Sequence, residues 1–439
     1  MDPRSIATGL AAFPGRAPGS DAERRAAGWL AGRLRGGGRE VSVRTLWVRP
    51  QWPVSLALHA AAGVAASILV TSAPVVGGAI LLAILVSAWL EVSGRTFVVR
   101  AMLPRRATQN VIATQDPPPP DVATARLVLT AHYDAPRTGL AYRDGVRRAA
   151  ARALGGRAPG LAGLLLGALT VLIAVAALRL GDVDAPAVRG VQLAATVVLL
   201  LALALLVDTA LSPVSPGAND NASGTAVAAA VADALHRAPP RNLAVEVVLA
   251  GAGEGTALGF GAYVGELRRT VAREDAVVLE VLPCGRGSPR FWTHDGVGPP
   301  LRLHPRLVAL AREVARDEAH LGAAPHRGHG SSGAYAARVA GYPALAVGCL
   351  DDDALAPGAR QATDTVERLD PAALRAALEL CLALVARIDG EVGARRRASG
   401  ARGPEGVRQS VLRRGGRTRR ASRGWRASRG SPPPRPQPP

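Results

Sequence analysis

Apolar residues gather in four long stretches that contain no charged side chain. Residues 53–71 and 75–90 are separated only by Ser72-Ala73-Pro74, and residues 158–178 and 190–207 are separated by a short polar segment. A helix needs about 20 apolar residues to cross a bilayer. The pattern therefore predicts two transmembrane hairpins, within residues 49–93 and 158–211. Buried core helices are the alternative, but tryptophans near the ends of the stretches favour a membrane.

Arginines are distributed unequally around these stretches. Ten of them flank the stretches on the side that holds both chain termini, whereas only Arg179 and Arg189 lie on the opposite side. Because cytoplasmic loops carry the excess of positive charge, this asymmetry predicts an integral membrane protein with both termini and its soluble part in the cytoplasm.

Outside the hairpins, short apolar runs alternate with helical patterns. The runs predict strands at residues 40–48, 127–130, 243–250, 276–281 and 344–349, and the helical patterns lie at residues 224–236, 256–269, 305–317 and 371–388. This alternation predicts an α/β domain whose mainly parallel sheet carries helices on both faces. The two hairpins would interrupt that domain, which is then built from residues 1–48, 94–157 and 212–390.

The net charge of +19 is concentrated at the carboxyl end. Residues 391–439 hold 14 arginines and two glutamates, so this tail supplies +12. Its Arg, Gly, Ser and Pro content cannot bury enough apolar surface to fold, and we expect it to be disordered. Anionic membrane lipid is its expected partner; a merely solvated tail is the alternative, and nucleic acid is not expected. The sequence indicates no oligomeric state.

The remaining composition excludes several classes of protein. All 53 lysine-or-arginine positions are arginine. Without lysine, Schiff-base catalysis, phosphate-binding loops of the P-loop type and protein-kinase sites are excluded. The three cysteines, Cys284, Cys349 and Cys381, are widely spaced and support neither a disulfide framework nor a thiolate zinc site.

Polar residues stand where the predicted strands end. His132 and Asp134 follow the first apolar strand, Asp220 precedes a helix, Glu254 follows the next strand, and Glu280 lies in the strand after it. Ligands of such sheets bind beyond the carboxyl ends of the strands. An imidazole with several carboxylates suits zinc or manganese, and a shared carboxylate can bridge two ions. Taken singly, each residue has a structural alternative, such as a helix cap for Asp220.

These residues stand in motifs that resemble a known family. The segments in question are, in order, AHYDAPRTG, SPGANDNASGTA, VVLAGAGEGTALGFGAYV, AVVLEVLPCG, GYPALAVG and ATDTVERLD. They are similar to the motifs of the M28 family of dizinc exopeptidases, which includes bacterial leucyl aminopeptidases and glutamate carboxypeptidases. The resemblance spans the whole predicted soluble part, and it implies the zinc exopeptidase fold.

The resemblance also implies a role for each residue. His132 matches the first metal-ligand histidine, and Asp134 matches the carboxylate that orients it. Asp220 matches the bridging aspartate, Glu254 the metal-binding member of a glutamate pair, and Glu280 the next acidic ligand. Asp134 and Glu254 are then the implied catalytic residues, and zinc is the implied cofactor.

Two positions depart from the family pattern. Gly253 stands where the family has the glutamate that acts as general base, and Arg360 stands where it has its last histidine ligand. An arginine is always protonated and cannot bind zinc. If only the base is missing, Gly253→Glu is expected to raise hydrolysis by about 10²-fold or more.

The metal content expected from these departures is one zinc ion. His132, Asp220 and Glu280 would hold it, and a second ion would need His326 or His329 as a replacement ligand.

Two functions stay open at this point. The first is a membrane-anchored zinc metallopeptidase of the aminopeptidase type, which hydrolyses peptide bonds near substrate amino termini. The second is a catalytically impaired relative that binds a peptide or a partner at the membrane. A transporter is a weaker third reading, because His59 is the one ionisable residue within the apolar stretches.

Overall fold

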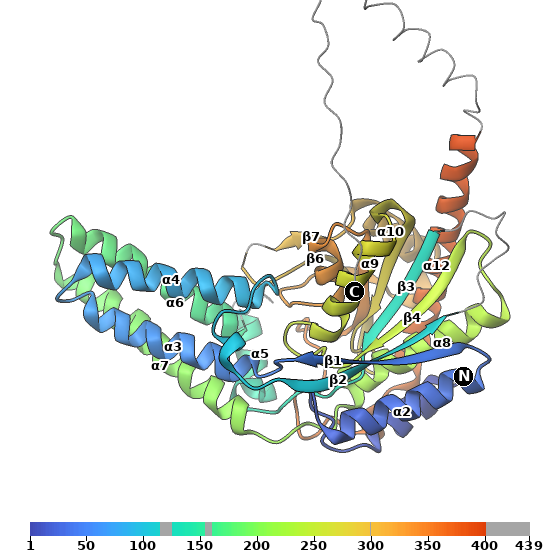
Figure 1. The fold of residues 1–439 in the computed structure, drawn as a ribbon, viewed down its shortest axis with the longest axis horizontal. Helices are drawn as coiled ribbons and strands as arrows, with labels where there is room; N and C mark the ends of the chain where they lie inside the picture. Colours follow the sequence, from blue (N-terminus) through green and yellow to red (C-terminus); the bar gives the residue numbers. More distant parts are fainter. Residues whose placement is uncertain (115–124, 154–159, 299, 401–439) are drawn as a thin grey trace, which may run out of the picture. The chain divides into compact units, whose positions relative to one another are not determined.

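The computed structural model describes residues 1–114, 125–153, 160–298 and 300–400, with the side chains of residues 396–400 left out. Nine strands form one sheet in the order β1-β2-β4-β3-β5-β9-β6-β7, with β8 paired to β6 (Figure 1). The strands are β1 (Glu40–Val48), β2 (Arg106–Thr114), β3 (Ala125–His132), β4 (Leu243–Ala250), β5 (Ala276–Val281), β6 (Ser288–Asp295), β7 (Leu301–Arg302), β8 (Ala324–Arg327) and β9 (Ala344–Leu350).

The sheet is mixed, which corrects the expectation of a mainly parallel one. Its centre, β4-β3-β5-β9, is parallel, whereas β1, β2, β6 and β7 add antiparallel pairs on either side. The sequence pattern missed β2 because its buried positions include Thr108, Gln109 and Asn110. These polar side chains are tolerated because Thr108 and Asn110 donate hydrogen bonds to Glu23 and to the Gly259 carbonyl.

Helices cover the sheet. Every residue of β5 and β9 is buried, so both faces of the central sheet are covered, as the apolar runs predicted. The helices of this part are α1 (Pro3–Ala11), α2 (Asp21–Gly36), α5 (Asp144–Ala153), α8 (Gly224–Arg237), α9 (Leu258–Thr270), α10 (Pro305–Asp317), α11 (Gly333–Val339) and α12 (Pro371–Gly400). Helix α12 continues past its predicted end at residue 388, and residues 401–439 of the predicted tail lie outside the described residues.

Four further helices form a bundle with its own apolar core (Figure 1). They are α3 (Trp52–Leu69), α4 (Pro74–Val92), α6 (Leu161–Leu180) and α7 (Pro186–Leu211), and each is long and apolar enough to cross a membrane. Their bounds fall within the predicted hairpins, and Pro74 opens α4 because proline is tolerated in the first turn of a helix.

The bundle is inserted into the α/β fold at two places. The first hairpin, α3 and α4, joins β1 to β2, which pair along their whole length from Glu40–Thr114 to Val48–Arg106. The second hairpin, α6 and α7, lies between β3 and α8. Both hairpins therefore leave and re-enter the α/β part at one end of the bundle, next to the carboxyl ends of β3 and β4.

Candidate functional site

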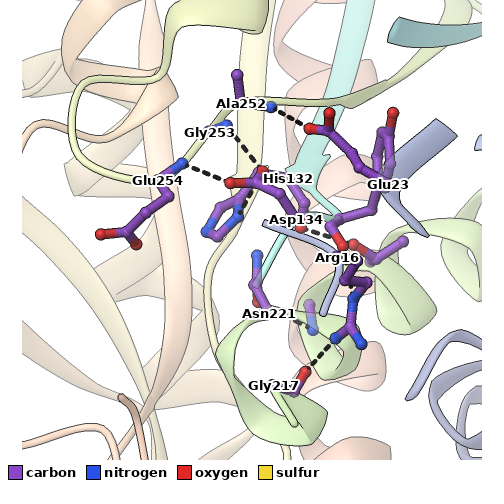
Figure 2. A network of polar contacts seen from close by, with 12 residues as sticks. Arg16, Glu23, His132, Asp134, Gly217, Asn221, Ala252, Gly253 and Glu254 are labelled. Atoms are coloured by element: carbon purple, nitrogen blue, oxygen red, sulfur yellow. Dashed lines mark hydrogen bonds and ion pairs between the residues drawn. The ribbon is translucent and has the colours of Figure 1, made fainter. Parts of the chain in front are cut away.

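The parallel pairing of β3 with β4 brings two site motifs together. His132 lies opposite Ala250, so the loop that follows β4 begins beside the end of β3. Asp134 is fully buried, and its two carboxylate oxygens accept the backbone N–H groups of Gly253 (2.8 Å) and Glu254 (2.9 Å) (Figure 2). Its Oδ1 also lies 3.3 Å from Nδ1 of His132. Asp134 therefore orients both the imidazole and the loop that carries Glu254.

His132 is surrounded by negative charge. Burial alone would lower the pKa of its imidazole, but the carboxylates of Asp134, Asp220 and Glu254 outweigh that effect and raise this pKa to about 9. The cavity around His132 thus favours positive charge.

Asp220 is placed by a second buried carboxylate. Its own N–H and that of Asn219 donate to the two oxygens of Asp364, at 3.0 and 2.8 Å. Burial raises the pKa of Asp364 to about 7, although both N–H groups favour its ionised form.

Arg16 joins the loops that carry His132 and Asp220. Its guanidinium is fully buried and donates to the carbonyls of Tyr133 (2.9 Å), Gly217 (2.5 Å), Pro216 (3.0 Å) and Leu10 (3.2 Å) (Figure 2). Burial lowers its pKa to about 10, but the guanidinium stays protonated at neutral pH. Sequence reasoning missed Arg16, because its role depends on residues far away along the chain.

Glu280 is fixed by the backbone of another segment. It is buried in β5, and its oxygens accept the N–H groups of Gly333 (2.9 Å) and Ala334 (2.7 Å). Burial raises the pKa of Glu280, while these two N–H groups oppose the rise. His132, Asp134, Asp220 and Glu280 form the histidine side of the site.

Glu254 faces an arginine. The Arg360 guanidinium forms an ion pair with Glu254 Oε1, and the glutamate side chain is only 9% exposed. The guanidinium carbon also lies 5.4 Å from the ring centre of Trp52 and 4.5 Å from that of Tyr142, at cation–π distance. Burial raises the pKa of Glu254, and the charge of Arg360 opposes that rise. Glu254, Arg360, Trp52 and Tyr142 form the arginine side of the site.

Gly253 is more than a missing side chain. A Cβ atom at this position would lie 2.1 Å from Cβ and 2.5 Å from Cγ of His132, far inside van der Waals contact. The space that a glutamate would need is therefore filled by His132. The expectation that Gly253→Glu restores a general base is corrected by this packing, because the substitution must first displace the imidazole.

The predicted residues other than Asp134 line one cavity of about 310 Å³. His132, Asp220, Glu254, Glu280 and Arg360 all contribute to it, and Asp295, which the sequence analysis did not single out, adds a further carboxylate. The apolar part of the wall includes Phe260, Leu282, Pro283 and Trp292.

The proposed replacement ligands are not at this cavity. Neither His326 nor His329 lines it, and the His326 ring packs edge-on against Trp292 at 4.9 Å. Burial lowers the pKa of His326 to about 4, so this imidazole is neutral.

The arrangement does not match a zinc site. Among the residues that the structure describes, no three histidine, cysteine, aspartate or glutamate side chains approach closely enough to hold a metal ion. On the arginine side, the one carboxylate is already paired with a guanidinium. On the histidine side, the donor types suit zinc but they do not converge on a point. The assignment of His132, Asp220, Glu254 and Glu280 as ligands stays a prediction.

Comparison with known proteins finds one family model that matches part of the chain. Residues 206–385 match the model of peptidase family M28. A zinc aminopeptidase from Bacillus subtilis superposes with a TM-score of 0.50 at 14% identity, covering 87% of this chain and 93% of that one. A glutaminyl cyclase from Tannerella forsythia superposes with a TM-score of 0.51 at 14% identity, covering 88% and 97%. A glutaminyl cyclase from Bacteroides thetaiotaomicron superposes with a TM-score of 0.51 at 12% identity, covering 88% of this chain and 96% of that one.

These solved structures share the fold, and no curated protein sequence matches the chain. The matched segment contains Asp220, Glu254, Glu280 and Arg360, so the family match covers both sides of the cavity except His132 and Asp134. Residues 206–385 of this chain are therefore similar to peptidase family M28, and the solved structures share its fold.

Proposed function

We propose that this chain is a membrane-anchored M28-family protein that binds peptide amino termini and whose capacity for hydrolysis is impaired. The cavity supports binding, since Asp220, Glu254, Glu280 and Asp295 bring four carboxylates against two cations, Arg360 and the protonated His132. Such a surplus of negative charge suits the ammonium group of a peptide. The apolar wall suits a hydrophobic first side chain.

The observation that carries this proposal is the ion pair of Arg360 with Glu254 inside the cavity. It neutralises the carboxylate that the family resemblance assigns to a metal ion, and Gly253 offers no side chain as a base. General base catalysis contributes typically about 10²–10⁴-fold in rate, so its loss together with a lost ion weakens hydrolysis strongly.

A zinc-dependent aminopeptidase is the second candidate. It is favoured by the presence of His132, Asp220 and Glu280 in the wall of a single cavity, because these donor types suit zinc. In that case, a small shift of the histidine side would complete the site for one ion.

Binding and metal content separate the two candidates. The purified full-length chain is titrated with Leu-Gly-Gly and with its amino-acetylated form, and acetylation should weaken binding tenfold or more because it removes the charge that pairs with carboxylates. Asp220→Asn should reduce this preference, whereas Glu266→Gln, an exposed change on α9, should leave it unchanged. Equal affinity for both peptides would contradict the proposal.

Hydrolysis is then measured with leucyl-p-nitroanilide, and bound zinc by elemental mass spectrometry. The proposal expects less than one equivalent of zinc and no turnover above the blank. One or more equivalents of zinc, with turnover that a chelator abolishes, would favour the second candidate.

Membrane anchoring is supported by the outer surface of the helix bundle. Large apolar side chains stand exposed there, for example Ile68 (64%), Leu82 (52%) and Leu193 (67%), as expected of helices that face lipid.

We expect the protein to stay in membranes after carbonate extraction. A reporter fused after Pro439 should be active only if it functions in the cytoplasm; a periplasmic or extracellular signal would contradict the orientation.

A further inference from the structure

A second cavity adjoins the site at the end of the helix bundle. It has a volume of about 290 Å³ and lies between the amino-terminal loop, the start of α3 and the end of α7. We call it the membrane-edge cavity. Glu254 and Arg360 line both this cavity and the cavity of about 310 Å³ described above. Anything that occupies it would therefore lie beside the arginine side of the site.

The membrane-edge cavity has a surplus of positive charge. Arg106, Arg137 and Arg360 line it, and its one acidic residue, Glu254, is already paired with Arg360. Among the residues that the structure describes, neither Arg106 nor Arg137 forms an ion pair with a carboxylate. Arg137 donates instead to the Ser212 carbonyl at 2.6 Å, which holds its guanidinium at the end of α7.

Much of the remaining wall is apolar, and this apolar part continues onto the outside of the bundle. Trp52, Pro53, Val54 and Ala210 face the cavity. From Val54, the outer surface of α3 continues one turn on through Leu58, which is 48% exposed. Leu211, at the end of α7, is 79% exposed. A hydrocarbon chain leaving the cavity would lie along this surface.

We propose that the membrane-edge cavity binds the phosphate head group of an anionic phospholipid, with its acyl chains against the outer faces of α3 and α7. Basic pockets between membrane helices on the cytoplasmic side suit such head groups. The phosphate oxygens would accept hydrogen bonds from Arg106 and Arg137, whose planar guanidinium groups match phosphate geometry. This inference rests on the membrane anchoring proposed above, and it does not depend on peptide binding or hydrolysis.

The test is calorimetric titration of the full-length protein in uncharged detergent with dioctanoyl phosphatidic acid, dioctanoyl phosphatidylcholine and inorganic phosphate. Phosphatidic acid should bind saturably, and the two other probes should not compete at the same concentration. Each arginine near a membrane surface contributes about fivefold to binding, so Arg106→Gln with Arg137→Gln should weaken it about 25-fold. The matched control is Arg105→Gln, which removes the same charge from the neighbouring, exposed residue outside the cavity.

The arginine-rich tail is present in every variant, so differences between variants report the cavity alone. Arg106→Gln by itself should weaken binding about fivefold, and it serves if the double variant fails to fold, because Arg106 is exposed. Equal binding by wild type and the double variant would overturn the proposal, as would equal affinity for phosphatidylcholine. If inorganic phosphate displaces phosphatidic acid, the ligand of the cavity is free phosphate and the lipid proposal is overturned. If carbonate extraction removes the protein from membranes while phosphatidic acid still binds, the proposed membrane anchoring is wrong but lipid binding in the cavity stands.

Discussion

The two sides of the cavity are held in different ways. On the histidine side, Asp134, Glu280 and the supporting Asp364 each accept two backbone N–H groups. On the arginine side, the carboxylate of Glu254 is held by a single side chain, Arg360, which stacks on rings from α3 and from the segment before α5. Backbone donors are supplied by the fold itself, whereas a side-chain partner can be exchanged by one substitution.

This difference bears on the proposal that one half of the site is kept and the other is lost. The histidine side retains the donors that the family resemblance implies, because the loops that carry them are tied to the sheet. The arginine side has its own fixed cation in Arg360, and its chemistry is coupled to the helix bundle through Trp52. The comparison predicts that damage to the histidine side costs more stability than damage to the arginine side.

The largest effect is expected for Arg16→Met. Removing the guanidinium leaves four carbonyls from three segments without their buried donor and takes one positive charge away from Asp134, Asp220 and Asp364. Breaking a buried charged network of this kind costs about 3–5 kcal/mol of unfolding free energy. Denaturant titration of the purified full-length protein measures it. Arg24→Met, which loses an ion pair whose partners are both 64% exposed, should change stability by less than about 0.5 kcal/mol.

A smaller loss is expected for Arg360→Met, about 2–3 kcal/mol, because Glu254 is left buried without a partner but Arg360 itself is one-fifth exposed. Adding Glu254→Gln should recover most of this loss, since replacing both partners removes the uncompensated charge. If the double variant is as unstable as the single one, the ion pair does not stabilise the arginine side. The contacts of Arg360 with the two aromatic rings then account for the stability that is lost.

Gly253→Ala tests the junction between the two sides. The added Cβ would meet His132 at 2.1 Å, so either the loop or the imidazole must move, at a cost of about 1–3 kcal/mol. Gly261→Ala within α9 is the matched control, because a Cβ there meets nothing within 4 Å and alanine favours a helix. A Gly253→Ala protein of wild-type stability would show that the loop is freer than its two hydrogen bonds to Asp134 indicate.

Much of this site follows from the sequence, for a definable reason. His132, Asp220, Glu254 and Glu280 could be placed together because each stands at a strand or helix junction, and junctions at one end of a parallel sheet meet. The apolar hairpins could also be located, because four uncharged stretches determine them almost alone.

Other features depend on contacts between distant segments and leave no local signal. Arg16 contacts Tyr133 and Gly217, which follow 117 and 201 residues later. Glu23, in the first turn of α2, accepts the N–H of Ala252 at 2.8 Å, although the two residues are 229 positions apart. Gly253 reads in the sequence as an absent base, and only the packing shows that His132 fills its space.

The smallest effect concerns the aromatic rings that stack on Arg360. Tyr142 lies 4.5 Å from the guanidinium carbon, and such a cation–π contact contributes about 0.5–1 kcal/mol when it is partly exposed. Tyr142→Leu should therefore be less stable than Tyr142→Phe by about that amount, because both variants lose the hydroxyl and only leucine loses the ring. Thermal unfolding of the two variants side by side measures the difference. In an Arg360→Met background the difference should vanish, since no cation remains for the ring to attract; if it persists unchanged, the ring stabilises the segment by packing alone, and the arginine side is held by Glu254 without help from its aromatic neighbours.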